Sequence, residues 1–324
     1  MGEQRDYLLE IKGLEVCYVT EDGVARAVNG LDLAIRKGES LGLVGETGAG
    51  KTTSCLSIMQ LVPDPPGVIT GGEILFRGEN LIYATAKRME AIRGKSISMI
   101  FQDPMTALNP VMTVGRQLEE VVMVHDKLSR SAAKARVVEA LEVVGVKGDR
   151  YDDYPHQFSG GMKQRVVITM ALLCRPELLI ADEPTTALDV TIQAQVLEII
   201  GKLQAETGTG LLLVTHDLGV VRETCRNVAI MYAGRVVESG TVEEVFGGAR
   251  HPYTQGLFQS IPRMKKGGGK LTPIEGLPPN PRRLPAGCAF HPRCKFAQPR
   301  CCAEAPVMQG VGHRCACWNI GGVD

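Results

Sequence analysis

The residues Gly45-Glu-Thr-Gly-Ala-Gly-Lys-Thr52 combine framing glycines with a lysine and a threonine, a spacing that suits the binding of phosphate groups. Glycines let the backbone curl so that successive N–H groups point at phosphate oxygens, and a helix that begins there adds its positive dipole end. Lys51 then reaches the β- and γ-phosphates of a nucleotide, and the Thr52 hydroxyl binds Mg²⁺. An ordinary glycine turn is the alternative, but an apolar strand precedes the loop and a helical stretch follows it. The predicted nucleotide-binding residues are Gly45, Glu46, Thr47, Gly48, Ala49, Gly50, Lys51, Thr52 and Thr53.

A second chemical pattern is an apolar strand that ends in two carboxylates, Leu178-Leu-Ile-Ala-Asp182-Glu183. In a parallel sheet the carboxyl end of such a strand lies beside a phosphate loop. Asp182 is therefore predicted to hold the water shell of Mg²⁺, and Glu183 to orient the attacking water. Alone, the pattern is more often that of a solvated strand end, so the prediction depends on the phosphate loop.

A third pattern, Phe158-Ser-Gly-Gly-Met162, resembles the signature loop of ABC-type ATPases. Most members have Leu and Gln where this chain has Phe158 and Met162. The hydroxyl and the bare N–H groups that face a phosphate at a helix start come from Ser159, Gly160 and Gly161, which are all present. The resemblance implies that these three residues act in trans, on the nucleotide bound by a second ATPase subunit.

The other family motifs follow in the family's order, over about residues 7–245. The resemblance implies that Tyr18 stacks on adenine, that Gln102 senses the γ-phosphate and that Ala187-Leu-Asp189 contacts the partner subunit. It further implies that His216 holds the attacking water and the γ-phosphate, so that Glu183, His216 and Gln102 form the catalytic set. The Mg²⁺ ligands implied in this way are Thr52, Gln102 and Asp182.

Two further segments indicate a branch of that family. His251-Pro-Tyr-Thr-Gln-Gly-Leu-Phe-Gln-Ser-Ile-Pro262 resembles the C-terminal extension of dipeptide and oligopeptide importer ATPase subunits, and Phe101-Gln-Asp-Pro-Met-Thr-Ala-Leu-Asn-Pro110 resembles their Q-loop. Importers of nickel and other small solutes share this group, so the solute stays open at this point.

The resemblance also implies partners. They are a second ATPase subunit, two transmembrane permease subunits and, indirectly, an extracytoplasmic peptide-binding protein. The second ATPase subunit is a further copy of this chain or a paralogue, and the resemblance favours the paralogue. The expected location is peripheral, on the cytoplasmic face of the cell membrane, with the Q-loop around Gln102 in the groove that receives a permease helix.

Six of the ten cysteines gather in the C-terminal part of the chain. In a reducing compartment such a group favours metal ligation over disulfides. The spacing is wider than the two to four residues typical of a structural zinc site, and four thiolates on an irregular loop suit a [4Fe–4S] cluster, which the family resemblance also favours. Zinc, and free or oxidised thiols, are the alternatives. The predicted ligands are Cys288, Cys294, Cys301 and Cys317, with Cys302 or Cys315 as substitutes.

The elements that must position these residues follow from hydrophobic patterns. Residues 8–43 alternate around Asp22-Gly23, which predicts an antiparallel sheet, and residues 228–239 predict two strands joined at Ala233-Gly234. Three apolar runs predict buried parallel strands, and two segments with helical periodicity predict a helix of a separate lobe and a crossover helix. The three apolar runs are Leu41–Val44, Leu178–Ala181 and Leu211–Val214. The helix of the separate lobe is expected at Ala133–Val144, and the crossover helix at Ile192–Leu203.

The expected fold class is therefore α/β, a P-loop NTPase of ABC type. A RecA-like core carries an antiparallel β-subdomain and a helical subdomain, and a small irregular Cys-rich module follows. The expected domains are residues 1–250, with the helical subdomain at about 103–175, and residues 251–324. A shift in composition near residue 262 predicts a linker before the cysteines.

The charge balance and the lengths of the apolar runs argue against several classes of function. Lys and Arg number 36 and Asp and Glu number 36, so no overall field attracts nucleic acid or an anionic membrane. No apolar run approaches the roughly 18 residues of a membrane helix, and the polar start of the chain predicts a cytosolic protein without a secretory signal. A soluble ABC ATPase acting on nucleic acid or ribosomes, and a metal or redox module, are the competing classes. The single phosphate loop and the absence of a basic block disfavour the former, and only the cysteines favour the latter.

Overall fold

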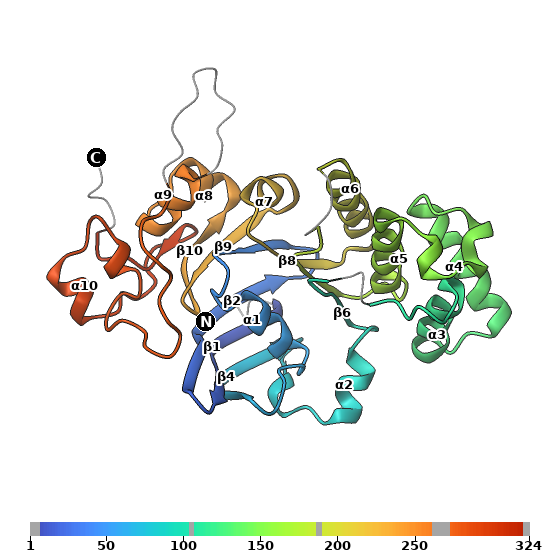
Figure 1. The fold of residues 1–324 in the computed structure, drawn as a ribbon, viewed down its shortest axis with the longest axis horizontal. Helices are drawn as coiled ribbons and strands as arrows, with labels where there is room; N and C mark the ends of the chain where they lie inside the picture. The colour runs from blue at the N-terminus through green and yellow to red at the C-terminus, as the bar shows by residue number, and fades with distance from the viewer. Residues whose placement is uncertain (1–6, 104–106, 186–189, 261–272, 320–324) are drawn as a thin grey trace, which may run out of the picture. The chain divides into compact units, whose positions relative to one another are not determined.

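The computed structural model describes residues 7–103, 107–185, 190–260 and 273–319. These residues divide into two compact units. The first comprises the chain up to Leu8 with Ile35–Ser40 and Tyr83–Val214, and the second comprises Leu9–Ala34, Leu41–Ile82 and Thr215–Asp324. Figure 1 follows the chain through both units by colour.

The second unit contains a four-stranded sheet in the order β2-β1-β4-β5. The predicted turn at Asp22-Gly23 joins the first two strands, and β4 runs antiparallel to β1 with Leu9 opposite Phe76. Alternate side chains are buried along β2, as expected of a sheet with one covered face. The prediction of an antiparallel sheet in this region is confirmed, and β4 and β5 add strands from further along the chain. The bounds are β1 Tyr7–Thr20, β2 Gly23–Arg36, β4 Gly67–Phe76 and β5 Glu79–Asn80.

The same unit contains a second group of strands. β3 (Ser40–Val44) is wholly buried and pairs in parallel with β9 (Asn227–Tyr232), which continues through the predicted turn at Ala233-Gly234 into the antiparallel β10 (Arg235–Thr241). The short β11 (Arg314–Cys315) pairs with β10. The sequence predicted the β9–β10 hairpin but not that β9 lies beside β3.

In the first unit, β7 (Leu178–Asp182) pairs in parallel with both β6 (Ile97–Ile100) and β8 (Gly210–Thr215). Both β7 and β8 are buried along their whole length, which explains their continuous apolar sequence. The crossover helix α6 (Val190–Thr207) joins them, and Val196 and Ile200 are buried as its apolar stripe predicts. The parallel strands and the crossover helix are confirmed.

Helices α3, α4 and α5 contact one another in the first unit and form the green group in Figure 1. The predicted helix at Ala133–Val144 is α4, which buries Ala133, Val137 and Leu141. Strands β4, β5 and β6 come before these helices in the chain. The long stretch between the apolar runs Leu41–Val44 and Leu178–Ala181 is therefore not purely helical. The bounds are η1 Leu81–Tyr83, α2 Ala86–Ile92, α3 Val114–Asp126, α4 Arg130–Val143, η3 Gly148–Asp152, η4 Pro155–Gln157 and α5 Gly160–Leu172.

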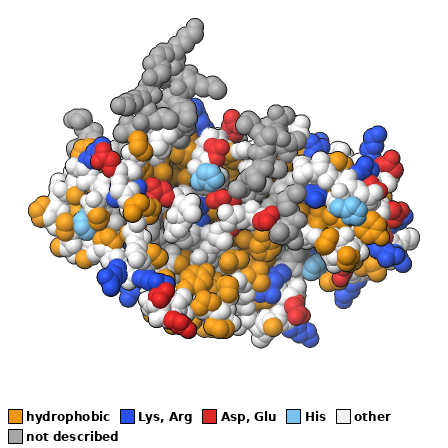
Figure 2. Space-filling model, in the orientation of Figure 1, with side chains coloured by type: hydrophobic (Ala, Val, Ile, Leu, Met, Phe, Trp, Pro, Cys, Tyr) orange, Lys and Arg blue, Asp and Glu red, His pale blue; other side chains and the backbone are white. Residues whose placement is uncertain are grey.

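The remaining helices are short and belong mostly to the second unit. None of the helices that the described residues form is both long and apolar enough to cross a membrane. Figure 2 shows acidic and basic side chains interspersed on the face that it draws, in keeping with their equal totals. The bounds are α1 Lys51–Ile58, α7 Leu218–Thr224, α8 Val242–Gly247, α9 Pro252–Gln259, η5 His291–Arg293 and α10 Pro299–Ala303.

Candidate nucleotide site

The predicted phosphate loop joins the end of β3 to the start of α1, as its sequence requires. Gly50 takes the N-cap position of α1 with a left-handed φ of 101°, a conformation that favours glycine. A Cβ atom at Gly45 would overlap the carbonyl oxygen of Met231, and one at Gly50 would overlap that of Ala27. The backbone itself packs against neighbouring strands at these two glycines, which fixes the curvature of the loop.

Lys51 is buried, and its ammonium group donates to the carbonyl oxygens of Gly45 (2.7 Å) and Glu46 (3.1 Å). The charge is therefore held inside the loop that would enclose a phosphate. Thr53, two residues on, lies 3.3 Å from the hydroxyl of Tyr18. This contact brings the predicted adenine-stacking residue to the helix that begins at the loop.

The first unit holds a second group of predicted site residues. Asp182 is buried at the end of β7, and Glu183 follows it with a left-handed φ of 47°. The Glu183 N–H donates to the Val214 carbonyl at 2.8 Å, which ties this turn to β8. The Gln102 amide lies 3.4 Å from the Glu183 carboxylate. The structure thus brings together Gln102 and Glu183, which are far apart in the sequence.

The signature segment begins helix α5. Ser159 is its N-cap, and its hydroxyl accepts from the Met162 N–H at 3.4 Å. Ser159 and Gly160 are exposed, and a Cβ at Gly160 would meet open space. Phe158 is buried, with the Arg150 guanidinium 4.9 Å from its ring centre. Phe158, which stands where most family members have Leu, is therefore a packing residue. This difference leaves the exposed Ser159 hydroxyl and Gly160 in place.

Two predictions fall partly or wholly outside the described residues: the partner-contacting Ala187-Leu-Asp189 and the middle of the Q-loop, residues 104–106. The predicted linker near residue 262 lies there as well. His216 is exposed directly after β8.

Sequence reasoning missed a set of contacts to Glu46, the second residue of the phosphate loop. Its N–H donates to the hydroxyl of Tyr253 at 2.9 Å, and its carboxylate forms an ion pair with Arg293. Both partners lie more than two hundred positions further along the chain. The sequence signal is that Glu46 is the single acidic residue of a loop that is predicted to bind phosphates.

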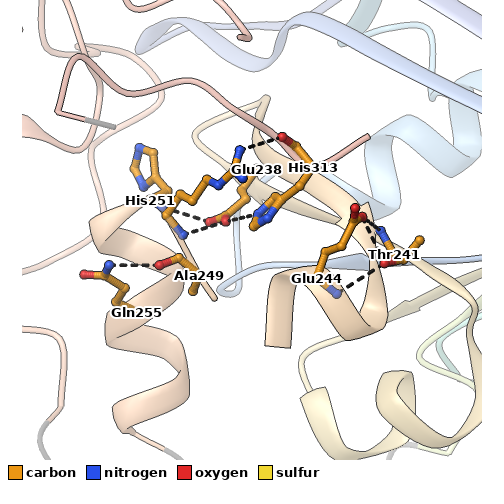
Figure 3. A network of polar contacts seen from close by, with 8 residues as sticks. Glu238, Thr241, Glu244, Ala249, His251, Gln255 and His313 are labelled. Atoms are coloured by element: carbon orange, nitrogen blue, oxygen red, sulfur yellow. Dashed lines mark hydrogen bonds and ion pairs between the residues drawn. The ribbon is translucent and has the colours of Figure 1, made fainter. Parts of the chain in front are cut away.

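A buried carboxylate organises the segment that follows β10. Glu238 is 0% exposed and accepts from the N–H groups of Arg250 (2.7 Å) and His251 (2.9 Å). The His313 ring nitrogen lies 2.6 Å from the same carboxylate. Figure 3 shows these groups converging from three parts of the chain, with the capping pair Thr241 and Glu244 nearby. Glu238 thereby connects β10, the start of α9 and the residues before β11.

Four cysteines, the predicted cluster ligands, line one small cavity with Phe290 and Trp318 around them. Burial, together with the smaller effect of the three other cysteines, raises the pKa of the Cys288 thiol to about 11. Burial also raises the pKa of Cys294 and of Cys317. Cys302 is exposed and Cys315 is buried beside β10. The four cysteines are Cys288, Cys294, Cys301 and Cys317.

These cysteines do not form a site for one metal ion. Over the part of the chain that the structure covers, no group of three or more His, Cys, Asp or Glu side chains is arranged to hold such an ion. The zinc alternative therefore gains no support from the described residues.

Comparison with known proteins decides the family. A family model described as ABC transporter matches residues 28–186, and one described as Oligopeptide/dipeptide transporter, C-terminal region, matches residues 237–301. A probable peptide ABC transporter ATP-binding protein of Sinorhizobium fredii is 47% identical over 97% of this chain and 95% of its own length. The chain belongs to the ABC transporter family of ATP-binding proteins. Like the other members of that family, it is an ATPase.

Other comparisons agree with this family. The oligopeptide transport ATP-binding protein OppD of Bacillus subtilis is 50% identical over 93% of this chain and 85% of its own length. Among solved structures, the ATP-binding cassette MJ0796 in a dimeric post-hydrolysis state with ADP and Pi has a TM-score of 0.65 and 26% identity, covering 72% of this chain and 98% of that chain. The ABC ATPase fold predicted from the motifs is thereby confirmed.

Proposed function

We propose that this ABC ATPase powers a multisubunit importer of di- and oligopeptides. The observation that carries the proposal is the match of residues 237–301 to the oligopeptide/dipeptide transporter C-terminal region. Relatives named for peptide, oligopeptide and dipeptide transport support it at 47–50% identity. Nothing among these relatives favours an ATPase that acts on nucleic acid or ribosomes.

The proposed chemistry assigns one role to each motif. Residues 45–53 bind the phosphates and Tyr18 stacks on adenine. Mg²⁺, which neutralises charge that develops on the phosphates, is held by Thr52, Gln102 and Asp182. Glu183 then polarises the attacking water, while His216 holds that water and the γ-phosphate.

The subunit arrangement is part of the proposal. Two ATPase subunits pair head to tail, so that Ser159–Gly161 of one subunit closes over the nucleotide of the other, with Asp189 at the contact. Exposure of Ser159 and Gly160 supports this role, because an approaching phosphate meets no covering side chain. Closing changes the access of two permease subunits, which receive cargo from an extracytoplasmic peptide-binding protein. The proposed location is the cytoplasmic face of the membrane.

For the domains, we propose residues 1–250 as the ATPase, including a helical subdomain at about 103–175, and residues 251–324 as the importer-type extension. In that extension we propose a [4Fe–4S] cluster held by Cys288, Cys294, Cys301 and Cys317. Four cysteines on one cavity support it, because each thiolate of such a cluster binds a different iron and the sulfurs need not converge on one ion. Burial raises the pKa of Cys288, Cys294 and Cys317, which implies that loading releases protons.

The test of the transport function is reconstitution. The chain is co-expressed with candidate permease and ATPase partner subunits, placed in vesicles and supplied with a candidate peptide-binding protein and a labelled peptide. We expect ATP-dependent uptake, and loss of uptake in Glu183→Gln with nucleotide binding retained. The substitution removes the water-orienting carboxylate, so turnover falls about 100-fold or more. ATP-dependent uptake of nickel but no peptide would reject the peptide assignment, and unchanged turnover in Glu183→Gln would reject the role of that carboxylate.

The test of the cluster is anaerobic purification followed by iron and sulfide analysis. We expect brown protein whose iron content falls in Cys294→Ser and stays unchanged in the matched control Cys174→Ser, which lies in the other unit. Colourless protein with stoichiometric zinc would reject the cluster.

A further inference from the structure

Glu46 and Arg293 form a two-point ion pair. Arg293 Nη1 lies 2.7 Å from Glu46 Oε2, and Nη2 lies 3.1 Å from Oε1. The Arg293 side chain is 5% exposed and that of Glu46 is 25% exposed, so water screens the pair only partly. Paired planar groups of this kind are among the strongest and most directional contacts that side chains make.

Arg293 is held in this position by several other groups. Its Nε donates to the Glu275 carbonyl at 3.0 Å, and Nη1 lies 3.3 Å from the Tyr232 hydroxyl. The guanidinium also lies 5.9 Å from the centre of the Phe290 ring. Because these contacts fix the side chain before any ligand binds, Arg293 presents its charge to Glu46 at little further entropic cost.

The N–H group of Glu46 is anchored by the same part of the chain. It donates to the hydroxyl of Tyr253, which is fully buried. The carbonyl of Glu46 accepts from Lys51. That carbonyl also accepts from the Ala49 N–H at 3.1 Å. Every polar group of this one loop residue therefore has a partner, and two of the four partners lie beyond residue 250.

The charge of Glu46 gives these contacts a consequence for ligand binding. A carboxylate inside a loop that receives phosphates repels them, and in a partly desolvated site that repulsion is stronger than in water. The Arg293 guanidinium offsets the charge and keeps the carboxylate turned toward itself. Without Arg293 the loop would carry an unpaired negative charge beside Lys51, and the Lys51 ammonium would be drawn toward it.

We propose that Arg293 is a positioning residue of the ATP site, which neutralises and holds Glu46 so that the cysteine-rich extension sets the affinity of the phosphate loop for nucleotide. The inference rests on the proposed role of residues 45–53. Arg293 lies next to Cys294, one of the four proposed cluster ligands, so a change at the cysteines reaches the loop through one peptide bond and one ion pair.

The test is a double-mutant cycle on the full chain, with MgATP and MgADP affinities measured by titration calorimetry. We expect Arg293→Gln to weaken binding of both nucleotides about tenfold and to raise KM for ATP while kcat is retained. In the Glu46→Gln background, whatever its own affinity, we expect Arg293→Gln to add less than a twofold change. A residue with only a structural role would give the same loss in both backgrounds.

Two controls complete the experiment. Arg300→Gln removes an arginine of the same segment whose pair with Glu304 is largely exposed, and we expect parental affinity. Arg293→Lys keeps the charge without the two-point geometry, and we expect a smaller loss than in Arg293→Gln. Parental affinity in Arg293→Gln, or an equal loss with and without Glu46, would overturn the proposal. Lys51→Ala separates the two proposals, because unchanged affinity in that variant would reject the phosphate loop itself.

Discussion

The phosphate loop, residues 45–52, and the cysteine-rich segment, residues 288–317, lie in the same unit but are held in different ways. The loop sits between a buried strand and a helix, and its glycines pack against the backbone of other strands. The cysteine-rich segment contains only η5, α10 and β11. Its position depends on side chains such as Arg293 and His313, which pair with carboxylates elsewhere in the unit.

These two segments show two ways in which a stretch of irregular backbone becomes ordered. Packing of backbone on backbone needs glycine at fixed positions and tolerates no added atom. Side-chain pairing accepts an irregular backbone but concentrates the stabilising free energy in a few charged groups, whose loss leaves a buried partner unsatisfied. The two modes predict different responses to substitution.

The largest effect is expected in the loop. In Gly45→Ala the new methyl group overlaps the Met231 carbonyl oxygen, so the loop must shift and nucleotide affinity should fall about 100-fold. Gly48→Ala is the matched control, since its Cβ meets open space and only the left-handed backbone is strained. We expect this variant to lose about 1 kcal/mol of nucleotide-binding free energy. Fluorescent-nucleotide binding measures both. Equal losses would show that backbone packing does not hold the loop.

The next effect concerns pH and the start of α9. Burial lowers the pKa of His251 to about 4 from 6.5, and the side chain is 1% exposed. The unfolded chain therefore binds more protons between these values, so stability is full above pH 6.5 and falls by about 3 kcal/mol as pH drops to 4. Hydrogen exchange of α9 at several pH values measures this slope. We expect His251→Asn, which keeps an acceptor at the helix N-cap, to flatten it. A slope unchanged in that variant would assign the pH dependence to other groups.

A smaller effect is expected at the buried carboxylate of Glu238. His313→Ala removes one of its three partners, and we expect the cysteine-rich segment to lose about 2 kcal/mol of stability. Limited proteolysis under native conditions reports this loss. Arg314→Ala, at the exposed neighbouring residue, serves as control. Similar proteolysis of both variants would mean that side-chain pairing is not what holds the segment.

The smallest effect is expected at Cys302. This thiol is exposed, so Cys302→Ser should change stability by less than about 0.5 kcal/mol and leave iron content unchanged. Iron analysis of anaerobically purified protein checks the second point. A fall in iron would make Cys302 a ligand in place of one of the four proposed cysteines.

The difference between local contacts and contacts between distant residues explains which features could be predicted from the sequence. The left-handed backbone of Gly50 and the contacts of Lys51 with the carbonyls of Gly45 and Glu46 are local, so the types and spacing of these residues identified the loop, and the apolar runs identified the strands. Pairings such as that of Arg293 with Glu46 join residues far apart in sequence, and neither partner has a local pattern that marks it. The parallel pairing of β9 with β3 was missed for the same reason, because a hairpin sequence carries no information on which strand lies beside it.

The left-handed backbone at Glu183 has a consequence for how related genes diverge. A glutamate there costs about 1 kcal/mol that Asn or Gly would not, because glycine has no Cβ atom and the short polar Asn side chain tolerates this conformation. In the catalytic role proposed above, turnover requires the glutamate, and selection for turnover would keep it against that bias. In a duplicated gene released from such selection, the bias acts unopposed and drift toward Asn or Gly is favoured. We therefore expect paralogues that hydrolyse ATP to keep glutamate after the aspartate that ends β7, and paralogues without ATPase activity to have Asn or Gly there more often.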